Sequence, residues 1–424
     1  MLLSRAEAPA GHSLVCPRCD KIISRRTTDS IKKALSLSLA GLLMYLPAIL
    51  LPLMTMKSYG FSDSADILDS IVNFYRNGYY FVSFMVLISA VLFPLMLLTS
   101  IFIISIHLYL QRYPAYLARL FRAYLHLEEW AMVEVYLLGI MVTIIKMGNT
   151  AEIVYHTGIF CFTGLVLITI AIATVIDHDL FWRAIEQKGE KRPAGPAAHH
   201  HQNDANVTAA KRGLILCHIC QKLSSAALEG KGCPRCKETL HTRKPFSISR
   251  TWALILTSAI FLAPANMLPI MRVDFLGIPD RSTIMDGIIY FFQKGSYLIG
   301  LIIFTASILV PIFKIVGLII LLRSNQLCDL NLLRQKARMF RFITFIGRWS
   351  MLDIFVIALL SVLVDFGFFT SIHVAPAATY FCIVVASTMF AVITFDPRIV
   401  WDKCNPQKKI DPVKNTRTNF GKTL

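Results

Sequence analysis

Cysteine pairs with metal-ligand spacing are the residues of this sequence with the clearest chemistry. Cys217 and Cys220 form one CxxC pair, and Cys233 and Cys236 form a second pair after twelve intervening residues. Each pair brings two thiolates to one ion, and two pairs complete a tetrahedral site of four sulfurs. Four sulfurs fill the coordination shell of the metal, so no coordination position is left for a water molecule. We therefore expect a structural zinc ribbon, with iron as the chemical alternative for the same ligands.

A second cysteine pair, Cys16 and Cys19, stands near the beginning of the chain in the same Cys-Pro-Arg-Cys sequence as Cys233–Cys236. Its two missing ligands would fall at Leu3 and at a position before Met1. We therefore expect a partial N-terminal zinc ribbon. Two interpretations stay open: this ribbon has lost its site, or the natural start of the protein lies upstream.

Ionisable residues inside apolar stretches are the second group of candidates. Lys314 lies in the middle of an apolar run, just after Pro311. A charge inside a membrane span is costly, so it indicates a transport function by default. Alternatives remain for the other members of this group, because charges near span ends can be interfacial and hydroxyls can bond to their own helix. The predicted transport residues are Lys314, Lys146, Asp353, Glu134, Ser307 and Thr305.

The elements that must position these residues are membrane-spanning helices. Of 424 residues, 55% are hydrophobic and only 16% are charged, well below the share of a soluble domain. Apolar stretches long enough to cross a bilayer predict an all-α polytopic membrane protein with eight spans. Pro94 and Pro311 predict a kink or tilt in the second and sixth spans. The expected spans are 33–56, 79–110, 129–147, 158–178, 251–271, 296–322, 345–364 and 374–395.

The sequence repeats itself. Pro47, Pro52 and Pro94 return as Pro264, Pro269 and Pro311, all at an offset of 217 residues. Farther along, the offset becomes 219, where Glu134 corresponds to Asp353 and Lys146 to Asp365. Matches at a nearly constant offset predict two repeats of four helices each. Because four is an even number of spans, both repeats begin on the same side of the membrane, so they are expected to be parallel.

The charge distribution predicts which side of the membrane each connection lies on. The net charge of +17 concentrates in the connections after even-numbered spans, which the positive-inside rule places in the cytoplasm together with both termini. This distribution explains the basic composition without a nucleic-acid partner. The expected domains are a partial ribbon (1–30), a first repeat (31–185), a disordered linker (186–212), a second ribbon (213–245), a second repeat (246–402) and a cytoplasmic tail (403–424).

Several motifs together resemble the paraquat-inducible protein A family. They are the Cys-Pro-Arg-Cys knuckles, the doubled prolines of Leu262–Pro269, the Ala306–Pro311 segment, the Gly347–Asp353 segment, and Thr394–Arg398 followed by Trp401. The resemblance covers nearly the whole chain. The family's N-terminal knuckle precedes a Met-Leu stretch like the one at Met1, which favours a start site set too far downstream.

This resemblance implies a function that composition alone does not indicate. The family belongs to the inner membrane of bacteria with two membranes. Its partner contains repeated mammalian-cell-entry (MCE) domains that form a periplasmic tunnel, and the two together resemble a phospholipid transport system that maintains the envelope. Lys146 and Lys314 fall where family members carry intramembrane lysines.

The sequence also bears on other functional classes. The sequence contains no GxxxxGK[ST], GxSxG, HExxH or EF-hand motif, and we expect no enzymatic activity. Two alternatives stay open: a secondary transporter of a small molecule, with a site between the repeats, and a redox- or metal-responsive membrane scaffold built on the ribbons. Two segments between the spans, Asp66–Val72 and Thr283–Tyr290, are expected to lie along the outer membrane surface as short amphipathic pieces.

Overall fold

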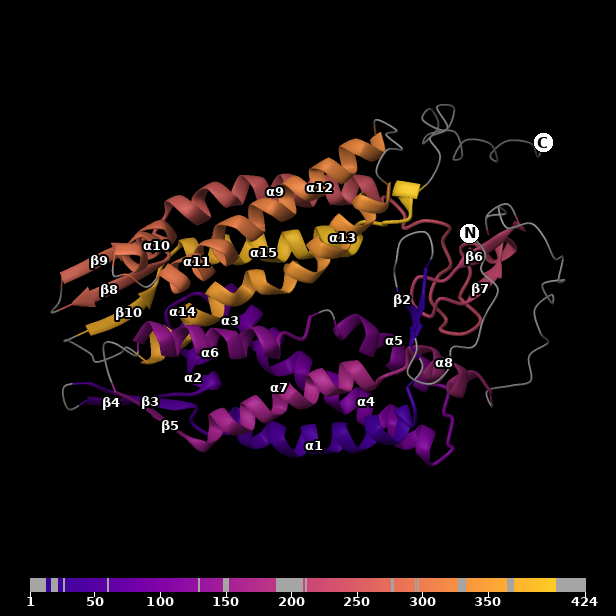
Figure 1. The fold of residues 1–424 in the computed structure, drawn as a ribbon, viewed down its shortest axis with the longest axis horizontal. Helices are drawn as coiled ribbons and strands as arrows, with labels where there is room; N and C mark the ends of the chain where they lie inside the picture. Colours follow the sequence, from indigo (N-terminus) through magenta and orange to yellow (C-terminus); the bar gives the residue numbers. More distant parts are fainter. Residues whose placement is uncertain are drawn as a thin grey trace, which may run out of the picture.

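The computed structural model is mainly helical, with a zinc-ribbon-like module at one end and small sheets at the other (Figure 1). Helices of the first half lie beside those of the second half in one elongated bundle. The predicted linker and the tail after Trp401 lie almost entirely outside the described residues. The structure describes residues 13–16, 22–25, 27–58, 61–128, 130–147, 152–187, 209, 212–275, 278–293, 295, 297–326, 333–363 and 370–401.

The two halves contain closely matching orders of elements. The first half comprises α1 (Ser30–Leu50), β3 (Met54–Ser58), β4 (Phe61–Ala65), α2 (Ile67–Arg76), α3 (Tyr80–Val86), η1 (Leu87–Leu92), α4 (Phe93–Tyr109), α5 (Leu117–Leu127), α6 (Val133–Met147), β5 (Glu152–Tyr155), α7 (Thr157–Val175) and α8 (His178–Gln187). The second half comprises α9 (Ser247–Met267), β8 (Met271–Phe275), β9 (Ile278–Ser282), α10 (Ile284–Gln293), α11 (Tyr297–Phe304), η4 (Thr305–Leu309), α12 (Val310–Gln326), α13 (Leu333–Gly347), η5 (Arg348–Met351), α14 (Leu352–Leu363), β10 (Thr370–Val374), α15 (Ala377–Thr394) and η6 (Ile399–Trp401).

Seven helical runs among the described residues are long and apolar enough to cross a membrane. The predicted span 129–147 corresponds to α6, a helix of 15 residues. At 1.5 Å per residue it is about 22 Å long, less than the ~30 Å hydrocarbon core. The seven runs are Ser30–Leu50, Tyr80–Tyr109, Thr157–Val175, Ser247–Met267, Gly300–Gln326, Leu333–Val362 and Ala377–Thr394.

The fold is mainly helical, as predicted, but two three-stranded antiparallel sheets that the sequence did not indicate lie beyond the helix ends. Their strand orders are β4-β3-β5 and β10-β8-β9. Pro52 and Pro269 end the preceding helical segments, and the chain continues as strand. The third strand of each sheet comes from about a hundred residues later, as when Thr55 pairs with Val154. Hydropathy cannot reveal such a pairing, because each strand is short and lies in a segment that connects spans.

The two prolines predicted to distort their spans each follow a π-helical segment. Segment η1 immediately precedes α4, which contains Pro94, and η4 immediately precedes α12, which contains Pro311. Proline has no amide hydrogen, and its ring clashes with the carbonyl four residues before it. The wider turn of a π-helical segment relieves this clash. The predicted outer amphipathic pieces are also present as helices, α2 and α10.

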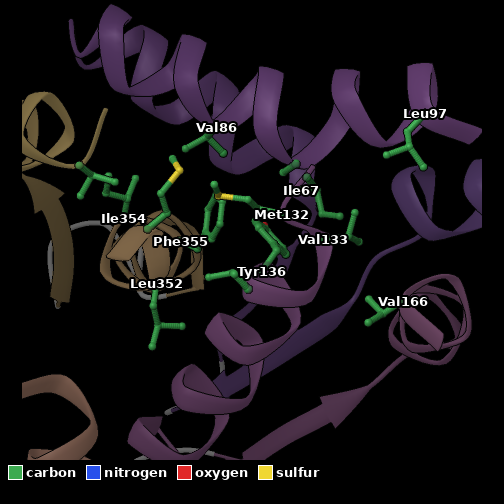
Figure 2. Close-up of a cluster of buried hydrophobic side chains, with 14 of the residues drawn as sticks. Ile67, Val86, Leu97, Met132, Val133, Tyr136, Val166, Leu352, Ile354 and Phe355 are labelled. Atoms are coloured by element: carbon green, nitrogen blue, oxygen red, sulfur yellow. The ribbon is translucent and has the colours of Figure 1, made fainter. Parts of the chain in front are cut away.

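The halves meet along α6 and α14, which pack against each other. Figure 2 shows Tyr136 of α6 facing Phe355 of α14, and their ring centroids are 5.1 Å apart. Gly139 lies at the same contact, where an added Cβ would come within 3.2 Å of Phe355 Cβ. This interface is apolar and tightly packed, so the two halves share one core.

Serine hydroxyls connect the first helix of each half to its last long helix, α1 to α7 and α9 to α15. Ser30 Oγ donates to the Val175 carbonyl at 2.7 Å and accepts from the Asp177 amide at 3.1 Å. Ser247, at the corresponding position, donates to the Thr394 carbonyl at 2.9 Å and accepts from the Asp396 amide at 2.9 Å. Each serine therefore satisfies backbone groups that the end of a helix leaves without a helical partner.

Candidate functional site

Lys314 is completely buried inside the second half, with a relative exposure of 0%. Its Nζ donates hydrogen bonds to Ser350 Oγ at 3.0 Å and to Thr388 Oγ1 at 3.0 Å. A longer contact of 3.4 Å reaches the carbonyl of Gly347. An ammonium group has three donors, so these three acceptors satisfy it fully. We call Lys314, Gly347, Ser350 and Thr388 the lysine cluster.

Four elements converge to form the lysine cluster, one of them α13, which ends at Gly347. Lys314 lies on α12 one turn after Pro311, Ser350 lies in the short helix η5, and Thr388 lies on α15. Gly317 allows α12 to approach α13, because a Cβ there would come within 2.6 Å of Ile343 Cδ1. The Thr388 hydroxyl donates its own hydrogen to the Val385 carbonyl at 2.9 Å, which leaves its lone pairs for Lys314.

No carboxylate forms an ion pair with Lys314 among the side chains that the structure describes. In the described part of the chain only neutral oxygens face this ammonium, and a buried charge in such surroundings is costly unless an anion or proton exchange compensates it. The lysine cluster can therefore hold a phosphate or carboxylate group electrostatically, or exchange a proton.

Two hydroxyl residues predicted beside Lys314 do not contact it. Ser307 is buried in η4, and its hydroxyl donates to the Ile303 carbonyl at 2.7 Å, in its own helix. Thr305 begins the same π-helical segment and is half-buried. Both precede Lys314 by about two turns along the span, so they extend the polar side of this helix but do not complete the cluster.

The other predicted charges belong to α6 and α14, the two helices that pack against each other between the halves. Glu134 is half-buried in the first turn of α6, and Asp353 occupies the first turn of α14. Lys146 lies near the other end of α6. The side chains of Asp353 and Lys146 are outside the described part of the chain, so their predicted roles remain predictions.

Ser350, Thr388 and Gly347 were missed by sequence reasoning. Ser350 belongs to the Gly347–Asp353 segment and Thr388 follows Ser387 in an otherwise apolar span, so each offered a weak polar signal. Only the fold brings them to Lys314. The first half lacks this cluster, since Leu97 and Ala131 stand at the positions that correspond to Lys314 and Ser350.

The second ribbon contains the four predicted cysteine ligands in one group. Cys217 and Cys220 stand between β6 (Leu214–Leu216) and β7 (Leu223–Ser225), which form an antiparallel hairpin. The sulfurs of these two residues and of Cys233 and Cys236 all lie within 4.8 Å of one another, and all four residues are buried.

Backbone geometry makes each pair into a knuckle. The amide of Cys217 donates to the Lys222 carbonyl at 3.0 Å, and the amide of Cys233 donates to the Glu238 carbonyl at 2.6 Å. The residue after each second cysteine adopts the left-handed region, with φ of 55° at Gln221 and 64° at Lys237. These turns wrap the backbone around one point and aim two sulfurs at it.

This donor set fits a tetrahedral soft-metal ion. Hydrogen bonds among the four thiols lower the pKa of Cys217 and Cys233 and raise the pKa of Cys220 and Cys236, because a thiolate suppresses the ionisation of its neighbours. Four thiolates in one buried group repel one another without a cation. The first ribbon is described only in part: Cys16 follows β1 (Ser13–Val15), which pairs with β2 (Ile22–Arg25), and Cys19 lies outside the described residues.

Comparison with known proteins agrees with the predicted resemblance. The family model described as paraquat-inducible protein A matches residues 31–186 and 248–405, one segment in each half. The chain belongs to this family. The two segments leave out the second ribbon and the linker before it, so the match rests on the membrane bundle.

Named relatives cover almost the whole chain. Intermembrane transport protein PqiA of Escherichia coli K12 is 30% identical over 405 residues, which are 95% of this chain and 94% of that protein. Lipophilic envelope-spanning tunnel protein A of the same organism is 31% identical over 95% of this chain and 89% of its own length. A probable intermembrane transport protein of Haemophilus influenzae is 29% identical over 91% and 90%. No solved structure matches the chain significantly.

Proposed function

We propose that this protein is the inner-membrane component of an intermembrane lipid transport system. It passes phospholipid to or from a periplasmic tunnel built of MCE domains, and so maintains the outer membrane. The names of its relatives, which describe intermembrane transport and an envelope-spanning tunnel, support this function. The observation that carries it is a fully buried lysine inside an apolar helical bundle.

The proposed topology has eight spans in two parallel repeats, with both termini and the ribbons in the cytoplasm. It counts α6 as the eighth span, which fits if the bilayer thins locally around a short helix. The matching order of elements in the two halves and the family match to both halves support the repeats. In this orientation the two sheets face the periplasm, because they lie at the end of the bundle opposite the second ribbon (Figure 1).

Lys314 is the proposed contact for a lipid phosphate. A phosphate oxygen can replace a serine or threonine hydroxyl at the ammonium and neutralise its charge, so the cluster is suited to bind and release such a group. Lys146, Glu134 and Asp353 are proposed to line the same transport route at the contact between α6 and α14. Protons taken up by the acids could couple the transfer to the proton gradient.

The four cysteines of the second ribbon are proposed to hold zinc. Bound zinc would cross-link the two knuckles and contribute to folding without taking part in transport. The protein's own residues would supply all four ligands, which leaves no open coordination position.

The test is Lys314→Met in cells that depend on this system for detergent resistance. Methionine keeps the length of the side chain and removes its charge. We expect resistance to fall while protein abundance and co-purification with the tunnel partner stay normal. Unchanged resistance would refute the assignment of Lys314.

A matched control is Thr169→Val, at the position of the first half that corresponds to Thr388. Thr169 donates to its own helix at the Val166 carbonyl, at 2.8 Å, and Leu97 stands at the first-half position that corresponds to Lys314. This change should leave resistance intact. If proteoliposomes that contain the protein alone accumulate a small solute, the alternative of a secondary transporter gains over lipid transfer.

A further inference from the structure

The second ribbon is joined to the first half of the bundle by charged contacts. Arg122 of α5 pairs with Glu238 of the ribbon at 2.9 Å. Glu186 of α8 pairs with Arg235 at 2.6 Å and also with Lys222. The ribbon thus contacts two helices from which the predicted linker separates it in sequence.

The same ribbon is also joined to the second half. Arg398, just after α15, donates to the Leu216 carbonyl at 3.2 Å. Lys244, near the end of the ribbon, donates from its amide to Asp396 Oδ2 at 3.2 Å and from its ammonium to the Ile393 carbonyl at 2.6 Å. The ribbon therefore stands between the ends of both halves.

Most contact residues of the ribbon belong to the cysteine knuckles. Leu216 immediately precedes Cys217, and the Lys222 carbonyl accepts the hydrogen bond that closes the first knuckle. Arg235 lies between Cys233 and Cys236, and the Glu238 carbonyl closes the second knuckle. The positions of these side chains thus depend on how the four sulfurs are held.

We propose that the second ribbon is a metal-dependent clasp that fixes the two halves of the membrane bundle to each other at the ribbon end. A metal bound by the four cysteines locks both knuckles, and the locked knuckles present Glu238, Arg235 and Lys222 to α5 and α8. Without the metal the knuckles separate, and the first half loses the contacts with the second half that run through the ribbon. This role is independent of the molecule that the protein transports.

Charge complementarity supports the clasp. On the first half the contact is mixed, with a guanidinium on α5 and a carboxylate on α8, and the ribbon presents the opposite charge to each. A non-specific contact would not place a carboxylate opposite the guanidinium and a guanidinium opposite the carboxylate. The contact between α6 and α14 holds the interior of the bundle independently, so loss of the clasp should loosen one end and leave the fold intact.

Amide hydrogen exchange of the full chain in detergent tests the proposal directly. Metal-loaded protein is compared with protein stripped by a zinc chelator. We expect exchange in α5 and α8 to rise about fivefold, in line with the loss of several partly exposed ion pairs. The middle of α7, far from the ribbon, serves as the internal control. If exchange rises only within residues 213–245, the ribbon is a local structural unit and the clasp is refuted.

A charge swap tests the same contact with all four cysteines intact. Arg122→Glu places two carboxylates together and should raise exchange in α5, while Arg122→Glu combined with Glu238→Arg should restore it. Arg183→Gln is the matched control, because it breaks the 3.1 Å pair of Arg183 with Asp179 inside α8. This control should leave exchange in α5 and in the ribbon unchanged. Failure of the swap to restore protection, or an equal effect of the control, would overturn the proposal.

Discussion

The ammonium nitrogen of Lys314 lies 3.0 Å from the hydroxyl of Thr388, a residue 74 positions farther along the chain. The two residues belong to different spans, α12 and α15, so the contact reports how these helices pack. It also gives the buried charge a partner that can be removed without touching the lysine.

Thr388→Val should destabilise the protein by about 1–3 kcal/mol, because valine keeps the shape and leaves one ammonium donor unpaired in an apolar interior. The measurement is thermal unfolding of the purified protein in detergent. Combined with Lys314→Met, the same change should cost much less, since no unpaired donor then remains. Equal costs in both backgrounds would mean that the hydrogen bond contributes nothing.

Gly158→Ala should disrupt the start of α7. An added Cβ would meet the backbone carbonyl oxygens of Pro52 and Leu51, the latter at 2.6 Å. Backbone atoms cannot move aside as a side-chain end can, so we expect a loss of roughly 1–3 kcal/mol. Gly164→Ala in the same helix is the control, since its Cβ would contact only the end of Met44 at 3.4 Å. Unfolding temperatures that fall equally for both variants would contradict this prediction.

Metal analysis of the purified protein should find zinc bound by four sulfurs at about 2.3 Å, measured by X-ray absorption. Cys233→Ser should reduce the zinc content of the second ribbon to near zero. Cys161→Ser, which changes a half-buried cysteine of α7 far from the ribbon, should leave it unchanged. A spectrum dominated by nitrogen or oxygen ligands would exclude the proposed four-sulfur site.

The N-terminus of α10 should be weakened by acid. The amide and hydroxyl of Thr283 both donate to Asp286, at 2.9 and 2.7 Å, and these hydrogen bonds hold the pKa of the Asp286 carboxyl below its usual value of 3.8. A lowered folded-state pKa stabilises the cap above the unfolded-state pKa, and this stabilisation is lost as the pH falls through the folded-state value.

Amide exchange of α10, corrected for the intrinsic rate, should therefore be faster near pH 3 than near pH 5. Asp286→Asn keeps the size of the side chain and should remove this dependence on pH. A dependence that survives in the variant would assign it to another group.

The sequence by itself determined the membrane class, the family, the positions of seven candidate spans and the group of four cysteines. Each depends on local information. A span needs about 20 consecutive apolar residues, and a CxxC pair needs only its own spacing to aim two sulfurs at one ion. Pro94 and Pro311 likewise indicated where helices would be distorted, because the effect of proline on its own helix is local.

The tertiary structure alone decided what surrounds each of these residues. The acceptors for Lys314 come from η5 and α15, and nothing in the sequence near Lys314 specifies Ser350 or Thr388. The same holds for the pairing of β3 with β5 and for the contact between Arg122 and Glu238, which are 116 residues apart. Such contacts depend on which helix faces pack together, and that is set by side-chain packing over the whole bundle rather than by any single segment.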